Sequence, residues 1–200
     1  MAYNNFTLNK LKEDFGLEHR KIAFLPPTIP KFDVSKRLLD ELSDALGMPL
    51  ASEKAKSEMI VTPILMELRR KNKTKISIFS GYTFDVDKAQ KLTGRCDFMI
   101  ANQPYLEEVN APMVCMVEAK NDLIESGFGQ CAAEMYAASI FNQRAGLAYT
   151  PIYGCTTAGF SWAFLKLEGN TIFIDPNYVG LSLQNPAEVL AVLQWILNEY

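Results

Sequence analysis

The chain has 200 residues, of which 48% are hydrophobic, and a formal net charge of −3. This is enough for one domain with a sizeable core. The acidic balance gives no overall attraction to a polyanion, so nucleic-acid binding would require a local basic patch. No stretch approaches the roughly 20 apolar residues of a membrane helix, and the N-terminus lacks the apolar core of a signal peptide. We therefore expect a cytoplasmic protein without membrane contact.

Histidine and cysteine usage narrows the chemistry. His19 is the only histidine and lies in the charged run "LEHRK", which argues against Ser-His-Asp triads, Cys-His dyads and histidine-metal sites. The four cysteines show no C-x-x-C spacing, which predicts reduced, buried thiols. Acid–base chemistry would then use carboxylates, lysine, tyrosine or metal-bound water.

The first third of the chain predicts an N-terminal arm followed by two helices. Residues 1–32 hold a short amphipathic piece and then "IAFLPPTIP", whose prolines exclude a regular central strand or helix, so we expect an arm packed on the domain. A helix is predicted in "DVSKRLLDELSDALG", with Asp33 or Ser35 as its cap. The run "SEKAKSEMIVTPILMELRRKNK" has helical periodicity, and Pro63 predicts a kink or a restart capped by Thr62.

The rest of the chain mixes strands and helices. Three β-rich segments, "KISIFSGYTFDV", "RCDFMIAN" and "APMVCMVEAK", predict a meander, and a helix is expected over about residues 128–142. Two or three strands follow in "TPIYGCTTAGFSWAFLKLEGNTIFID", with Gly169-Asn170 turning a hairpin, and a last helix is expected with Asn185 as cap. This order predicts one α/β domain over residues 33–200 with a mixed sheet.

The segment "CMVEAKND", residues 115–122, ends a strand of buried character with charged residues. Because alternate side chains of a strand share a face, Glu118 and Lys120 are expected to project together. The preceding strand offers Asp97 among apolar neighbours. Adjacent strands lie about 4.8 Å apart, so Asp97 and Glu118 can hold one divalent cation if the register aligns them.

A bound metal ion would explain why two carboxylates lie next to each other. Mg²⁺ takes hard oxygen ligands, neutralises the paired charge and lowers the pKa of a bound water. Lys120 beside it can stabilise negative charge that develops on a phosphate. This set is typical of phosphodiester hydrolysis. The alternative is a strand-end salt bridge, either Glu118 with Lys120 or Asp97 with Arg95.

The order of these motifs resembles the PD-(D/E)XK, or restriction-endonuclease-like, nuclease superfamily over about residues 52–165. A helix carrying Glu58 comes first, then Asp97, the run Glu118-Ala119-Lys120, and a helix that opens with Gln130. "VEAKND" followed by "GFGQCAAEMYAA" is similar to uncharacterised bacterial members. The resemblance implies a restriction-endonuclease-like α/β/α sandwich with a central mixed β-sheet, and Mg²⁺- or Mn²⁺-dependent hydrolysis of DNA. It leaves a homodimer open.

The resemblance also implies a set of metal ligands. Asp97 and Glu118 would hold the ion, with the Ala119 carbonyl as a further ligand. Glu58 would match the acidic residue of the first core helix and reach the metal directly or through water. The alternative for Glu58 is a solvated helix carboxylate.

Two further roles and two departures follow from the same comparison. Lys120 would be the catalytic lysine, and Gln130 would lie near the site and the substrate backbone. Arg95 and Cys96 stand where the superfamily often has a proline. One subgroup has a tyrosine four residues after the glutamine, whereas this chain has Glu134, which is either a further site carboxylate or a solvated residue.

Two functions from different classes remain open. The first is a Mg²⁺-dependent nuclease on DNA, for which a basic cluster could contact phosphate. That cluster also complements the dipole of the helix that it ends. It consists of Arg69, Arg70, Lys71, Lys73 and Lys75. The second is a non-catalytic binding or assembly module on a nuclease fold, which the acidic balance favours.

Overall fold

The computed structural model describes residues 3–147, 151–183 and 185–200. Its strands are β1 (Glu18–Lys21), β2 (Ser77–Ser80), β3 (Phe98–Ala101), β4 (Met113–Ala119), β5 (Ile152–Thr157), β6 (Ser161–Glu168), β7 (Thr171–Ile174) and β8 (Val179–Gly180). They form one sheet in the order β1-β7-β6-β5-β4-β3-β2, with β8 paired to β6. The β1–β7 and β4–β5 pairs are parallel and the other pairs are antiparallel. The predicted mixed sheet is confirmed.

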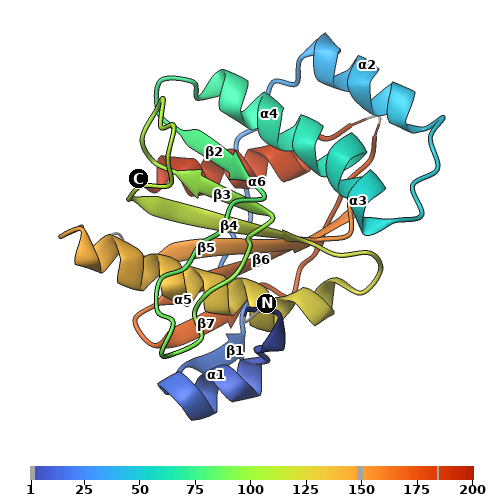
Figure 1. The fold of residues 1–200 in the computed structure, drawn as a ribbon. Coiled ribbons are helices and arrows are strands. Elements are labelled where there is room, and N and C mark those ends of the chain that lie inside the picture. The colour runs from blue at the N-terminus through green and yellow to red at the C-terminus, as the bar shows by residue number, and fades with distance from the viewer. Residues whose placement is uncertain (1–2, 148–150, 184) are drawn as a thin grey trace.

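Helices cover both faces of this sheet (Figure 1). Short helical turns are η1 (Tyr3–Asn5) and η3 (Ile124–Gly127), and a π-helical segment, η2, spans Ser57–Val61. The α-helices are α1 (Leu8–Phe15), α2 (Lys36–Ala45), α3 (Glu53–Lys56), α4 (Thr62–Lys71), α5 (Phe128–Arg144) and α6 (Ala187–Asn198). In Figure 1, α2, α4 and α6 lie on one face and α5 and α1 on the other. The chain is therefore an α/β protein with a central mixed sheet between helices.

The inner strand β4 is buried along its whole length and separates two hydrophobic cores. Met116 belongs to the core between the sheet and α5, whereas Val117 belongs to the core under α4 and α6. The alternation of a strand produces this division, because successive side chains point to opposite faces. Glu118 and Ala119 must follow the same alternation at the end of β4, which decides where the charged residues face.

The N-terminal segment contributes to the sheet as well as packing on it. β1 pairs in parallel with β7, so "EHRK" adds a strand that sequence periodicity did not indicate. At the start of α5, a Cβ at Gly129 would lie 2.3 Å from the Phe6 carbonyl oxygen. Only glycine permits this approach of two backbones. Residues 1–2 of the expected arm, and Thr150 at the start of the expected second group of strands, lie outside the described residues.

The predicted break at Pro63 takes the form of a π-helical turn. Ser52 caps α3 by accepting the Ala55 N–H, and the helix then widens through η2 into α4. The Thr62 N–H bonds to the Ser57 carbonyl, five residues back, and the following Pro63 has no N–H to donate. Of the restart alternative, Pro63 does lie in the first turn of α4, but Thr62 is not its cap, because Thr62 already has helical backbone angles and lies within the helix.

Most other expected elements are confirmed. Ser35 caps α2 by accepting the Leu38 N–H, and Gly169-Asn170 joins β6 to β7. Asn185 does not cap α6, because Pro186 takes the position before the helix and Asn185 pairs instead with Ser182. All four cysteines are free and buried. In the described ranges, no helix has the length and apolar character to cross a bilayer.

Candidate functional site

The start of β3 and the ends of β4 and β5 meet at one end of the sheet. The antiparallel register pairs Phe98 with Val117, so the preceding Asp97 falls opposite Glu118. Asp97 lies at the bend just before β3, and its charge acts on Glu118, so the two carboxylates lie near each other at this end of the sheet. Asp97 Oδ2 also accepts the backbone N–H of Ala119 at 2.9 Å, which holds this carboxylate at the strand end.

A chain of hydrogen bonds connects the end of β4 to the first turns of α5. Lys120 Nζ donates to Glu118 Oε1 at 2.6 Å and to Gln130 Oε1 at 3.0 Å. Gln130 Nε2 in turn donates to Glu134 Oε1 at 3.1 Å, one helical turn along. Gly127 makes room for this arrangement, because a Cβ there would lie 3.1 Å from Lys120 Cε. We call Glu118, Lys120, Gln130 and Glu134 the acid–lysine network.

The network is buried and leaves polar atoms without partners. Glu118 is 2% exposed, and Glu134 is 0% exposed. Within the described part of the chain, Glu118 Oε2, Glu134 Oε2 and Thr156 Oγ1 have no hydrogen-bond partner. Thr156 lies beside Glu118 in the parallel β4–β5 register. Unpaired buried polar atoms cost folding free energy, so a proton, a cation or another polar partner at these atoms would stabilise the network.

Charge in the network is unbalanced. Burial and the nearby Asp97 raise the pKa of Glu118 to about 8, although Lys120 opposes the shift. Burial would lower the pKa of Lys120, but the charge of Glu118 outweighs it and the pKa rises. Burial and Glu118 also raise the pKa of Glu134 well above its ordinary value. The 2.6 Å distance suits an ion pair, yet Asp97, Glu118 and Glu134 bring three carboxyl groups near one ammonium, and this excess of acidic groups favours the protonated forms of Glu118 and Glu134.

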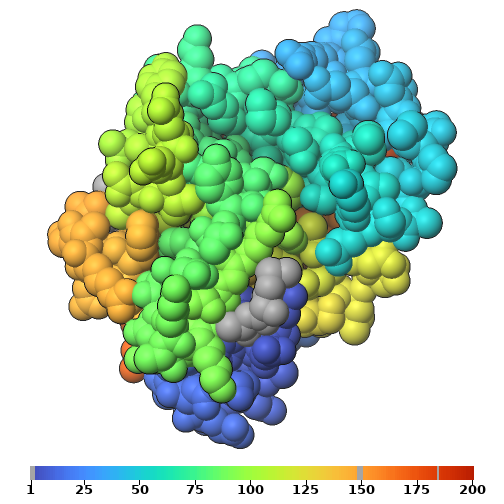
Figure 2. Space-filling view, viewed as in Figure 1, coloured from blue at the N-terminus to red at the C-terminus, as the bar shows by residue number. Residues whose placement is uncertain are grey.

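An open cleft of about 340 Å³ lies on the other side of Asp97, between the α3 region and the ends of β2–β4. In Figure 2 the connection between β2 and β3, in green, and the α3 segment, in cyan, lie next to each other on the face shown. We call this the α3 cleft. Its lining residues are Glu53, Lys54, Ser57, Glu58, Thr62, Ser80, Gly81, Arg95, Asp97, Phe98 and Ala119.

The expected site residues divide between these two places. Asp97, Ala119 and Glu58 line the α3 cleft, and Glu58 is a half-exposed carboxylate 3.5 Å from Lys54 Nζ. Gln130 lies near the site as expected, but it is buried behind Lys120 and does not line the cleft that a substrate backbone could enter. Asp97 belongs to both places, because it lines the cleft and faces Glu118 across the sheet.

Asp97 and Glu118 are the residues that could hold a divalent cation. Glu118 Oε2 is a buried oxygen without a donor, and carboxylate oxygens suit Mg²⁺. The two residues form a pair only: across the described residues, no group of three or more His, Cys, Asp or Glu side chains is placed to hold a metal ion. Glu58 therefore lies at the cleft without joining them, and further ligands would come from water, Ala119 or substrate.

Of the two alternative salt bridges, one is present. Lys120 pairs with Glu118, whereas Asp97 takes its hydrogen bond from the Ala119 backbone and not from Arg95. The sequence alone did not identify Thr156 as part of the site. Its place became evident only from the register of β5 on β4, which pairs strands about 40 residues apart in sequence.

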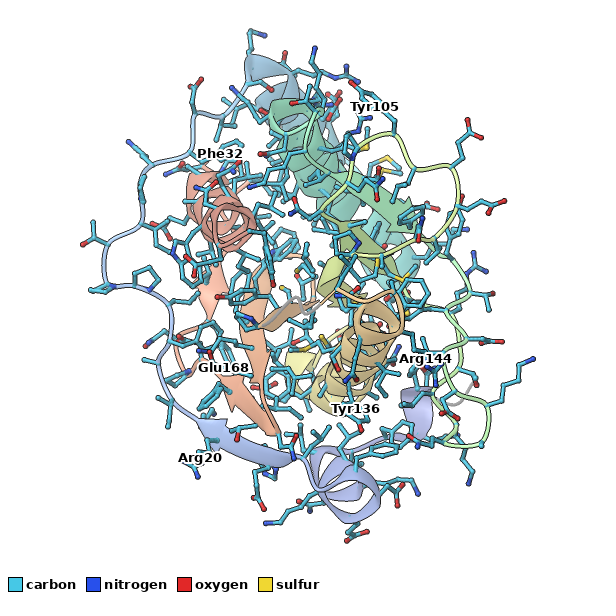
Figure 3. All side chains as sticks on the ribbon, turned by 90° about the vertical axis from the view of Figure 1, so that its left-hand side faces the viewer. Arg20, Phe32, Tyr105, Tyr136, Arg144 and Glu168 are labelled. Atoms are coloured by element: carbon cyan, nitrogen blue, oxygen red, sulfur yellow. The ribbon has the colours of Figure 1, made fainter. Side chains whose placement is uncertain are left out.

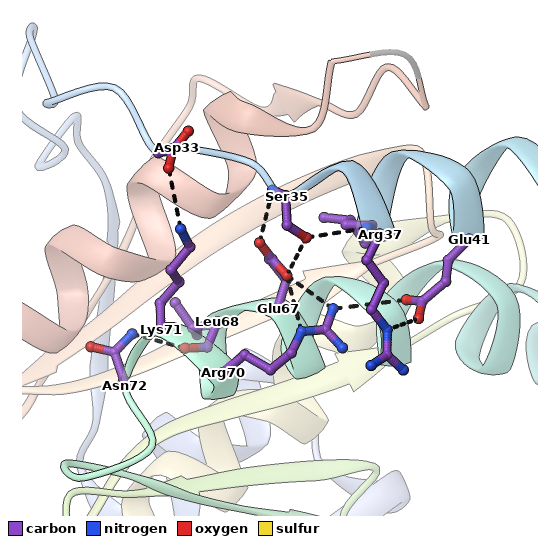
Figure 4. A network of polar contacts seen from close by, with 10 residues as sticks. Asp33, Ser35, Arg37, Glu41, Glu67, Leu68, Arg70, Lys71 and Asn72 are labelled. Carbon is purple, nitrogen blue, oxygen red and sulfur yellow. Dashed lines mark hydrogen bonds and ion pairs between the residues drawn. The ribbon is translucent and has the colours of Figure 1, made fainter.

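The basic cluster expected to contact phosphate lies away from the cleft. It ends α4, whereas Thr62 at the start of this ten-residue helix lines the cleft, a separation of about 15 Å. Arg70 bonds to Glu67 and Lys71 pairs with Asp33 (Figure 4), and Lys75 donates to the Leu197 carbonyl. Lys71 and Lys75 thus connect the end of α4 to the segment before α2 and to α6.

Comparison of the chain with protein-family models, with curated proteins and with solved structures finds no match.

Proposed function

We propose that the protein is a metal-dependent nuclease of the restriction-endonuclease-like type, which hydrolyses phosphodiester bonds of DNA. One observation carries the proposal: Asp97 and Glu118 face each other at the sheet end, with a buried carboxylate oxygen unpaired and Lys120 bound to the same carboxylate. A purely structural ion pair does not explain the unpaired oxygen, whereas a Mg²⁺ or Mn²⁺ ligand set does.

The residues have separate roles in this proposal. Asp97 and Glu118 hold the cation, which supplies Lewis acidity and activates a water when bound. The Lys120 ammonium, released in part from Glu118, stabilises negative charge on the phosphate in the transition state. Gln130 keeps its carbonyl on Lys120 and so fixes the direction of the ammonium. Glu58 lines the cleft and would reach the ion only through water.

Calorimetric titration with Mg²⁺ and Mn²⁺ tests the ligand pair. We expect binding by the wild type, loss of binding in Asp97→Asn and Glu118→Gln, and little change in the control Glu67→Gln. Cleavage of single-stranded, duplex and branched DNA at low salt is then measured with each metal. Ca²⁺ should bind but support little turnover, because its coordination is larger and looser. Absence of metal binding in the folded wild type would refute the site.

A second candidate is a binding or assembly module without catalytic activity. The hydrogen bond between Lys120 and Glu118 favours this candidate. It engages one oxygen of the proposed metal ligand and also the ammonium group that the nuclease would need. One assay of DNA binding and cleavage distinguishes the two functions. A wild type that binds Mg²⁺ and DNA but leaves every DNA uncut supports the module, whereas metal-dependent cleavage that Asp97→Asn abolishes supports the nuclease.

A further inference from the structure

Arg95 has an unusual setting in the α3 cleft. It is exposed and lies two residues before Asp97, on the same cleft wall. Its guanidinium rests on the backbone of Gly81: a Cβ there would lie 2.7 Å from Arg95 Nη2 and 3.1 Å from Nε. Gly81 has φ +68°, a conformation that favours glycine. The glycine therefore both turns the chain after β2 and leaves room for the guanidinium.

The Arg95 guanidinium is unpaired although carboxylates line the same cleft. Glu53, Glu58 and Asp97 all face this space, yet no hydrogen bond or ion pair joins Arg95 to any described residue. Lys54 in the same cleft pairs with Glu58. An arginine held on a cleft wall without an acidic partner presents its planar fork of N–H donors to whatever enters.

We propose that Arg95, supported by Gly81, is a phosphate seat that binds a backbone phosphate of the nucleic acid beside the Asp97–Glu118 pair. Guanidinium and phosphate match in charge and in two-point geometry. Such a contact positions the strand and reads no base, so it fixes where the backbone lies relative to the carboxylates. The identity of the ligand as nucleic acid rests on the proposed function, whereas the seat itself rests on Arg95 and Gly81.

NMR of the arginine Nε–Hε groups tests the seat without any cleavage. Wild-type protein is titrated with inorganic pyrophosphate, and the Arg95 signal is assigned with Arg95→Gln. Arg20 on β1, which points to solvent (Figure 3), serves as internal control. We expect a saturable shift of the Arg95 signal and none at Arg20. An Arg95 signal that does not move, or that moves no more than that of Arg20, overturns the proposal.

Variants then test the link to nucleic acid. DNA affinity is measured with Ca²⁺ in Arg95→Gln, Gly81→Ala and the control Arg20→Gln, after thermal unfolding shows that each is folded. We expect about tenfold weaker binding and a salt slope lower by about one in Arg95→Gln, with metal affinity unchanged. Gly81→Ala, which displaces the guanidinium and keeps its charge, should give a similar loss. Arg20→Gln should bind like the wild type.

The failures of the two proposals are distinguishable. If pyrophosphate shifts the NMR signal of Arg95 but the wild type neither binds nor cuts DNA, the phosphate site at Arg95 is supported and the nuclease proposal is refuted. If Arg95→Gln and the wild type bind and cut DNA equally well, with equal salt slopes, the phosphate seat is wrong and the nuclease proposal stands.

Discussion

Two regions of the molecule bury carboxylates, and the hydrogen bonding and the pKa of these carboxylates differ between the two regions. At the α2–α4 contact, Glu67 is 1% exposed and its two oxygens accept four hydrogen bonds from Ser35 and Arg70 (Figure 4). Burial acts to raise its pKa, but the Ser35 N–H and the Arg70 guanidinium outweigh burial and lower it. In the acid–lysine network, Glu118 and Glu134 are as deeply buried, but each keeps an unpaired oxygen and a raised pKa.

The contrast separates a carboxylate whose hydrogen bonds stabilise the fold from carboxylates that keep an unpaired oxygen, of which Glu118 is the proposed cation ligand. Glu67 is saturated, so its charge is stabilised and nothing more can bind to it. Glu118 and Glu134 are under-coordinated, so they reduce the stability of the free protein until a cation or proton arrives. The following changes test this distinction, from the largest expected effect to the smallest.

Lys120→Ala should reduce metal-dependent DNA cleavage by about a hundredfold or more, because a positioned cation of this kind contributes on that scale to the transition state. Metal affinity should change little, since in the proposed site the ion would be held by Asp97 and Glu118. The matched control is Lys71→Ala. Lys71 lies at the end of α4 away from the cleft and pairs with Asp33. Equal turnover in the two variants would remove Lys120 from the mechanism.

Glu67→Ala should lower the free energy of unfolding by about 3 kcal/mol, because it leaves the Arg70 charge and the Ser35 N–H without their acceptor. Urea denaturation at pH 7 measures the loss. Since the pKa of Glu67 is lowered in the fold, its contribution is present above the ordinary value of 4.5 and disappears as pH falls further. A variant that loses less than about 1 kcal/mol would contradict the assigned structural role.

Glu134→Gln should raise the free energy of unfolding by roughly 1–2 kcal/mol at pH 8, because it removes a buried carboxyl whose ionised form is disfavoured. The amide can still accept from Gln130. A raised folded pKa means that stability is lost as pH rises above the ordinary value of 4.5, so the gain should shrink toward pH 4.5. Chemical denaturation at several pH values gives the comparison. A gain that is independent of pH would indicate an ordinary packing effect.

Mg²⁺ affinity should fall as pH is lowered below about 8, the pKa of Glu118 in the free protein. In the proposed site the ion would displace a proton from this carboxyl, so the dissociation constant should rise up to about tenfold per pH unit as the pH falls. Titrations at pH 6.5, 7.5 and 8.5 in two buffers of different protonation enthalpy would also reveal the released proton. Affinity that stays constant across this range would show that Glu118 is already ionised.

Thr156→Val should change the free energy of unfolding by less than about 1 kcal/mol, with a small stabilisation as the expected direction. The hydroxyl is buried without a partner among the described residues, so the isosteric methyl removes an unpaired group. A clear loss of stability would imply a partner for this hydroxyl, such as a bound water. Thermal unfolding of the metal-free protein is sufficient for this measurement.

Local patterns predicted the fold well where one segment determines its own structure. The helices α2, α5 and α6, the β2–β4 meander and the β6–β7 hairpin all follow from periodicity and turn residues. β1 escaped prediction because its four residues, "EHRK", are all exposed and polar, so they carry no alternating pattern. Its place depends on the edge of β7, which lies about 150 residues later.

The site was predictable only in part for a similar reason. Strand alternation gave the shared face of Glu118 and Lys120, and helix spacing placed Gln130 next to Glu134. Burial was not predictable: Glu134 is a polar residue on a helix whose other residues are mostly buried, and its sequence position fits a solvated or a buried carboxyl equally. The ion pairs of the basic cluster were not predictable either, because their partners lie far away in sequence, as Asp33 does for Lys71.

The π-helical turn at Ser57–Val61 determines how α3, the helix directly before it, is rotated about its axis relative to α4. One residue corresponds to about 100° around a helix axis, so the extra residue in this turn decides which side chains of α3 face the cleft. A single-residue deletion here would restore regular winding and keep the packing of α4. It would also rotate Glu53 and Lys54 away from Asp97, so the wall of the cleft can be re-aimed by a change in chain length alone, with no substitution at any charged residue.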